Sequence, residues 1–392
     1  MVVSFFGDWF KTIALYAIVQ EMTGSAQAVA AVMVGKLLPV FLVTPIAGPL
    51  VDRVDRRLVM LGADFARAVT VLGIIVAHQM GSLYGVFGAL IVTVCFSGLF
   101  IPARTASIPS VTAPNELPVA LAMSAGTWSV TLAFGAAAGG LVTQVVGPDT
   151  ALALDSLTFL VSAAFLWSLP PLLPRERDAD DKATFTDGLV YLRERPYLST
   201  VISLKTAIGF AGGAVVTIPL YGNGHFPLTA GPLFMGLLYA FRGTGALVGS
   251  MVLRRFTGDR PDTMRGLIAP GFVLTALSYM ALGAFASDVW LAGFCFFSAA
   301  VGTGLVWVFA STLGQIASDS DYRGRVFSLE FAGMMLSMSF ASWLAGALID
   351  YTSLQTPDVA FWSGAAMLAP ALLWTVAMQV LKPTGDGRLK RD

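Results

Sequence analysis

Charged residues are scarce in this chain. Only 12% of the 392 residues are charged, while 56% are hydrophobic. A soluble globular domain of ordinary composition carries about twice that share of charge, so a soluble fold is excluded. The net charge is zero and no long basic run occurs. Nucleic acid is therefore excluded as a partner.

Cysteine, histidine and asparagine each occur only twice. Cys95 and Cys295 lie in apolar surroundings, so we interpret them as packing residues rather than a disulfide. His78 and His225 are too few for a metal site and have no obvious carboxylate partner. The chain contains no HExxH, GxxxxGK[ST] or CxxC pattern, so we expect neither a cofactor nor an enzyme activity. No asparagine begins an N-x-[ST] sequon, which favours a bacterial inner membrane.

Long hydrophobic runs, in contrast, fill the chain. Each is long enough to cross a hydrocarbon core about 30 Å thick as a helix. None alternates with the period of a barrel strand, so we predict an all-α membrane protein with twelve transmembrane helices. The predicted spans are residues 2–21, 27–50, 58–78, 83–106, 118–146, 150–169, 199–221, 230–253, 265–286, 288–313, 325–349 and 358–381.

Lysine and arginine are missing from every odd-numbered connection between these spans. Nineteen of the 24 lie in the even-numbered connections and the C-terminal tail. By the positive-inside rule, those connections and both termini are cytoplasmic. The first span has no charged leader or cleavage site, so we assign it to the bundle rather than to a signal peptide. The other five basic residues fall inside spans: Lys11, Lys36, Arg67, Lys205 and Arg242.

The spans form two similar halves. The Gly-x-x-x-x-Arg pattern at residues 48–53 recurs at residues 249–254. Parallel six-helix repeats, related by an axis along the membrane normal, are typical of transporters whose site lies between the halves. Within the link, Phe185, Leu189 and Leu192 have helical spacing and predict an interfacial helix; the alternative is a solvated linker. We therefore predict an N-terminal bundle (1–169), a cytoplasmic linker (170–198), a C-terminal bundle (199–382) and a cytoplasmic tail (383–392).

Residues 48–59 read GPLVDRVDRRLV, which resembles the signature G-x-L-[small]-D-R-x-G-R-R-x-[L/I] of the major facilitator superfamily. Val51 and Asp55 depart from that signature. The aspartate is similar to the branch that holds macrolide, multidrug and enterobactin exporters. Further phrases of that branch are Gly7-Asp8-Trp9, Thr23-Gly24-Ser25, Pro102-Ala103-Arg104 and residues 154–159. The resemblance implies two six-helix bundles related by pseudo-two-fold symmetry, and export.

The signature predicts a cytoplasmic gate. Gly48 permits close helix approach, and Asp52 is expected to face the positive N-terminus of a helix in the opposite half. The alternative is that the arginines only set topology and meet lipid phosphates. We expect the arginines of this segment to pair with nearby carboxylates such as Asp64. The remaining gate residues are Arg53, Arg56, Arg57 and Asp64.

The fifth span carries a run of small residues that resembles the antiporter motif G-P-x-x-G-G, with Ala136 in place of the proline. Such glycines allow tight packing or bending where the halves meet. Ordinary small-residue packing is the alternative. The residues of this motif are Gly126, Gly135, Gly139 and Gly140.

Ionisable residues inside the spans are the candidates for the transport site, since each costs at least about 2.5–3.5 kcal/mol to insert. Asp8 and Lys11 are i, i+3 neighbours that can pair. We hypothesise that Asp8 couples transport to protons, with Glu330 second; a static buried pair is the alternative. Asp155 and the pair Asp64–Arg67 are assigned structural roles. The expected substrate cavity contains Asp8, Lys11, Lys36, Trp128, Lys205, Arg242 and Glu330.

Cations outnumber carboxylates among these cavity candidates, which favours a neutral or anionic amphipathic substrate. We predict a secondary transporter of the multidrug efflux type. It would export drug-like or macrolide-like compounds by proton-coupled alternating access, as an antiporter. Alternatives are an exporter of an anionic metabolite such as a siderophore, a lysolipid flippase, or a nontransporting sensor or scaffold. The expected partners are the small-molecule substrate, protons and the lipid bilayer, and the chain is expected to be a monomer.

Overall fold

The computed structural model describes residues 2–51, 53–113, 130–173, 185–222, 231–252, 260–319 and 322–381, together with residues 116, 120, 123 and 127. No strand occurs among these residues. Within these described ranges, eleven spans are long and apolar enough to cross a membrane, and Thr131–Val146 adds a shorter apolar one. The prediction of an all-α multi-pass membrane fold is confirmed.

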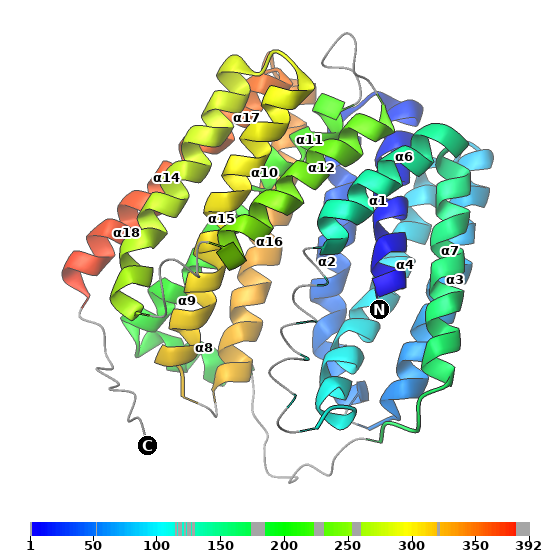
Figure 1. Ribbon diagram of the computed structural model, residues 1–392, viewed down its shortest axis with the longest axis horizontal. Helices are drawn as coiled ribbons and strands as arrows, with labels where there is room; N and C mark the ends of the chain where they lie inside the picture. The colour runs from blue at the N-terminus through cyan, green and yellow to red at the C-terminus, as the bar shows by residue number, and fades with distance from the viewer. Residues whose placement is uncertain are drawn as a thin grey trace.

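The first six spans pack together on one side of Figure 1. Gly24 and Gly147 have positive φ and close the short turns after the first and fifth spans; a side chain would strain both turns. The elements are α1 (Val2–Thr23), α2 (Ala26–Val51), α3 (Arg56–Gln79), α4 (Leu83–Ser107), the 3₁₀ turn η1 (Ile108–Ser110), the π-helix η2 (Thr131–Gly135), α6 (Ala136–Val146) and α7 (Pro148–Trp167).

The remaining elements form the other side of the molecule (Figure 1). The linker contains one helix, α8 (Phe185–Arg193). It is followed by α9 (Pro196–Gly209), α10 (Gly212–Val215), α11 (Thr217–Leu220), α12 (Pro232–Leu247), the π-helix η4 (Val248–Val252), α14 (Pro261–Phe285), α15 (Val289–Ala317), α16 (Arg323–Tyr351), α17 (Thr356–Ala366) and α18 (Leu368–Val380).

Two predicted spans are interrupted, and a proline explains one break in each. Proline has no N–H to donate to the carbonyl four residues earlier. Pro219 therefore cannot bond to Val215, where α10 ends, and Pro370 cannot bond to Ala366, where α17 ends. The seventh span is thus α9 to α11, and the twelfth is α17 with α18.

The two sides of the molecule meet at one end. We call this the outer end, because the charge pattern predicts that its connections, which include residues 24–25, 80–82, 147 and 352–355, face outside. There α6 lies against α12 and α2 against α16 (Figure 1). Glycines permit both contacts: a Cβ on Gly140 would lie 3.0 Å from Gly236 Cα, and one on Gly346 would lie 2.7 Å from Ala30 Cβ.

The linker helix α8 packs at the opposite, inner end. Tyr191 anchors it, because this side chain is buried, stacks on Tyr322 with 4.1 Å between ring centroids, and donates to Asp319 Oδ2 at 3.0 Å. Leu189, predicted on the apolar face, is exposed. The side chain of Phe185, residues 174–184 and the cationic residues at 253–259 and 382–392 lie outside the described residues.

Candidate functional site

An ion-pair cluster joins α1 and α7. Lys11 Nζ lies 2.6 Å from Asp8 Oδ1, so the expected pair is present, and 3.5 Å from Asp155 Oδ2. The side chains of Lys11 and Asp155 are buried, whereas 33% of the Asp8 side chain is exposed. Asp155, assigned a structural role from sequence, is thus the third member of the cluster. Asp8 is the member whose side chain is partly exposed.

Glycine at position 7 brings this cluster together. A Cβ there would lie 2.0 Å from Thr158 Oγ1 and 2.5 Å from Asp155 Oδ1. Only glycine lets α1 approach α7 so closely. Two of the phrases that carried the family resemblance, residues 7–9 and 154–159, therefore pack against each other around the charges.

Lys36 extends the cluster toward the other half. Its Nζ donates to Thr12 Oγ1 at 2.6 Å and lies 5.5 Å from the ring centroid of Trp9. The Trp9 ring in turn lies 5.2 Å from the ring of Tyr239 on α12, between ring centroids. The two halves thus meet through a pair of aromatic rings with a cation beside it.

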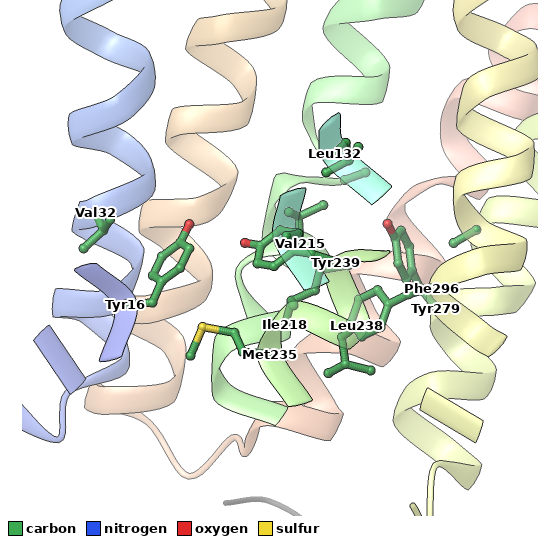
Figure 2. Packing of buried hydrophobic residues seen from close by; sticks show 14 of the residues in the cluster. Tyr16, Val32, Leu132, Val215, Ile218, Met235, Leu238, Tyr239, Tyr279 and Phe296 are labelled. Atoms are coloured by element: carbon green, nitrogen blue, oxygen red, sulfur yellow. The ribbon is translucent and has the colours of Figure 1, made fainter. Parts of the chain in front are cut away.

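Three buried tyrosines surround that meeting point. Tyr16 and Tyr239 stack with 6.3 Å between ring centroids, and Figure 2 shows their hydroxyl oxygens turned toward each other. Tyr279 of α14 lies on the far side of Tyr239 (Figure 2). Arg242, one turn along α12 from Tyr239, is half-buried and lies within electrostatic range of all three hydroxyls.

A second buried ion pair lies in the C-terminal half, away from the first. Lys205 Nζ is 2.6 Å from Glu330 Oε2, and both side chains are buried. The ammonium lies 4.5 Å from the centroid of the Trp307 ring. Glu330 thus provides Lys205 with a carboxylate partner inside the bundle.

Two glycines of the fifth-span motif pack against α1 of their own half, and a third contacts the opposite half. A Cβ on Gly135 would lie 3.1 Å from Trp9 Cδ1, and one on Gly139 would lie 3.0 Å from the Trp9 carbonyl oxygen. Gly140 packs equally closely against α12, where a Cβ would clash with Pro232 and Gly236. Of the other expected site residues, Gly126 and Trp128 lie outside the described residues.

The arginines of residues 48–59 have partners other than those expected. Arg56 donates to the carbonyl oxygen of Ala106 at 2.8 Å, and Arg57 donates to those of Leu166, at 3.2 Å, and Trp167. These carbonyls close α4 and α7, where the helix dipole attracts cations. The expected pairing with Asp64 is wrong, because Asp64 pairs with Arg67, one turn along α3.

Asp55 has a local role in this segment. Its Oδ1 accepts from the backbone N–H of Arg57 at 2.9 Å and of Leu172 at 3.0 Å. It therefore caps α3 and holds the chain that follows α7. Arg53 is exposed. Asp52 and the surroundings of Gly48 lie outside the described residues.

The family model for transmembrane secretion effectors, a group of major facilitator transporters, matches residues 1–386. The chain belongs to the major facilitator superfamily. The uncharacterized MFS-type transporter YfiS of Bacillus subtilis is 25% identical over 339 residues, which cover 83% of this chain and 79% of YfiS. Macrolide efflux protein A of Streptococcus pyogenes is 24% identical over 341 residues, 84% of this chain and 82% of that protein. The crystal structure of a D-xylose-proton symporter superposes with a TM-score of 0.72 at 13% identity, covering 95% of each chain.

This major facilitator chain also has a contact at its outer end that sequence reasoning missed. The Asp350 carboxylate, at the end of α16, accepts from the backbone N–H of Ala26 at 3.0 Å and of Gln27 at 2.9 Å, and from the Ser25 hydroxyl. It therefore caps α2 from the opposite half. The sequence Thr23-Gly24-Ser25 was the available signal, since it marks the start of α2, where Ser25 Oγ accepts from the Ala28 N–H at 3.0 Å and the N–H groups of Ala26 and Gln27 need another acceptor.

Two further residues singled out from the sequence, His78 and Arg104, also have contacts in the structure. His78 does have a carboxylate partner, contrary to expectation: its Nδ1 lies 2.7 Å from Asp149 Oδ1. The pair forms because α3 ends beside the start of α7. Arg104 of α4 is half-buried, and its guanidinium lies 5.2 Å from the ring centroid of Phe5 on α1.

Proposed function

We propose that this chain is a secondary transporter that exports small amphipathic compounds from the bacterial cytoplasm in exchange for protons. The macrolide efflux relative supports export. The observation that carries the proposal is the position of Asp8. Its partly exposed carboxylate is joined to Lys11 in the membrane interior, next to Trp9, whose ring contacts the opposite half.

In this proposal, protonation of Asp8 is what couples proton flow to movement of the two halves. A carboxylate paired with Lys11 and near Asp155 can take up a proton and release Lys11 to Asp155 alone. Because Asp8 and Trp9 are adjacent, this change acts on the helix that carries the contact with Tyr239. Protonation and the position of the two halves are therefore coupled in this proposal.

The arrangement of the halves supports alternating access. Gly140, Gly346 and Asp350 all make their contacts with the opposite half at the outer end. At the inner end, Arg56 and Arg57 bind carbonyls of their own half. We assign this arrangement to the inward-open state, with the termini cytoplasmic and the chain acting as a monomer in the inner membrane.

The test uses purified protein in proteoliposomes with an imposed pH gradient and a panel of cationic, neutral and anionic fluorescent compounds. Asp8→Asn is expected to abolish gradient-driven accumulation of the compound that the natural sequence transports. Asp262→Asn is the matched control, because the Asp262 side chain is 94% exposed at the inner end of α14. Full gradient-driven transport by Asp8→Asn would refute the role of Asp8.

A further inference from the structure

Arg242 differs from the buried cations of the spans in its lack of a carboxylate partner among the described residues. Buried cations of this chain have carboxylate partners: Lys11 with Asp8 and Asp155, Arg67 with Asp64, and Lys205 with Glu330. Within the part of the chain that the structure describes, Arg242 forms no ion pair. An arginine at this depth costs at least about 2.5–3.5 kcal/mol to insert. Such a residue is retained for a function.

The depth of Arg242 is central. It lies ten residues after Pro232, where α12 begins at the outer end. At 1.5 Å per residue, this is about 15 Å into the membrane. Lys36 lies ten residues after Ala26, where α2 begins, and so at the same depth. Lys36 has no ion pair in the described residues either, although Asp8 and Asp155 are within electrostatic range.

The surroundings of Arg242 are suited to an amphipathic ligand. The hydroxyl of Tyr279 forms a hydrogen bond with Arg242, those of Tyr16 and Tyr239 lie within electrostatic range of it, and Trp9 adds an apolar ring face next to Tyr239. Tyrosine hydroxyls can donate to an anion, and the aromatic rings can bury apolar surface. These side chains come from both halves, so a ligand bound here contacts both.

We propose that Arg242 binds a carboxylate of the transported compound, whose apolar part packs against Trp9 and the tyrosine rings. The inference rests on the proposed export function and names its substrate class. A single guanidinium matches a monoanion in charge, and its planar fork bonds both carboxylate oxygens. Lys36, beside the Trp9 ring, adds a second positive charge that repels cationic compounds.

The test measures binding to purified protein in neutral detergent by the fluorescence of three probes. Dansylglycine is anionic, its methyl ester is neutral, and dansylcadaverine is cationic. The natural sequence should bind dansylglycine most tightly. Arg242→Gln should weaken dansylglycine binding about ten- to hundredfold, the range for one charge-assisted pair, and leave the methyl ester unchanged. Arg242→Lys should retain part of the preference, because the charge remains.

Arg260→Gln is the matched control, since Arg260 is exposed at the inner end of the same half. It should bind all three probes like the natural sequence. Unchanged dansylglycine binding in Arg242→Gln, or tightest binding of dansylcadaverine by the natural sequence, would overturn the inference. The binding assay contains neither a membrane nor a pH gradient. A measured preference for the anionic probe would therefore hold even if the protein did not export compounds in exchange for protons. Equal binding of all three probes would contradict the inference even where export is observed.

Discussion

Asp350 provides the sharpest prediction about how the two halves separate. Its carboxylate bonds to the backbone N–H groups of Ala26 and Gln27 and to the Ser25 hydroxyl. All three groups belong to the opposite half, so these bonds must break when the outer end opens. Asp350→Ala should therefore favour the outward-open state.

The size of the effect follows from the geometry. Removing an aspartate cap from a helix N-terminus costs about 0.5–2 kcal/mol. Asp350 is exposed, so solvent screens its charge and a value of about 1 kcal/mol is appropriate. The cost falls on the outer-closed state alone. The ratio of outward-open to inward-open protein should rise about fivefold.

The assay is a distance measurement between spin labels at the outer end. Cys95 and Cys295 are first replaced by serine, and cysteines are then placed at Met80 and Thr352, which are exposed in opposite halves. Asp350→Ala should increase the population with the longer distance.

Asp288→Ala is the matched control for this measurement. Asp288 caps α15 through the N–H groups of Trp290 and Leu291, at 2.9 and 3.0 Å, within its own half. Its loss should weaken a helix start without shifting the distances. An unchanged distance distribution in Asp350→Ala, or an equal shift in Asp288→Ala, would refute the role of Asp350 in holding the outer end closed.

Two further substitutions test the packing. Gly140→Ala places a Cβ 2.5 Å from the Pro232 carbonyl oxygen, so the outer end should close poorly; transport should fall about tenfold or more, and the same spin labels should report longer distances. Normal transport by this variant would contradict the closed contact. Lys205→Ala leaves Glu330 buried without its ammonium partner, which should cost about 3–5 kcal/mol. Thermal unfolding in detergent should show the loss, and the double variant Lys205→Met with Glu330→Gln should recover most of it; equal unfolding temperatures for all three proteins would argue against the pair.

The spans were predictable from sequence because hydrophobic length and the distribution of lysine and arginine are properties of the chain alone. The interruptions at Val215 and Ala366 were also accessible in principle, from Pro219 and Pro370 four residues later. The division into 1–169, 170–198, 199–382 and 383–392 stays a prediction.

The site could be predicted only in part. The Asp8–Lys11 pair follows from i, i+3 spacing, which local sequence shows. Asp155 and Asp350 were not placed with their partners because those partners are 144 and more than 320 residues away in the chain. Spacing within one helix carries no information about such contacts.

The partners of Arg56 and Arg57 could not be predicted from sequence for a different reason. Sequence suggested carboxylates, since opposite charges attract. The structure shows backbone carbonyls at the ends of α4 and α7 instead. A helix C-terminus presents unpaired carbonyls that are invisible in a list of side chains. The gate proposed around Asp52 stays a prediction.

The most direct test of export in exchange for protons is the lumenal pH of proteoliposomes during transport. Vesicles with the inner end of the protein facing the bath are loaded with the pH indicator pyranine and made acidic inside. Addition of a transported compound to the bath should make the lumen more alkaline as the compound accumulates, and Asp8→Asn vesicles should show neither change. Accumulation of the compound with no change in lumenal pH would contradict proton exchange.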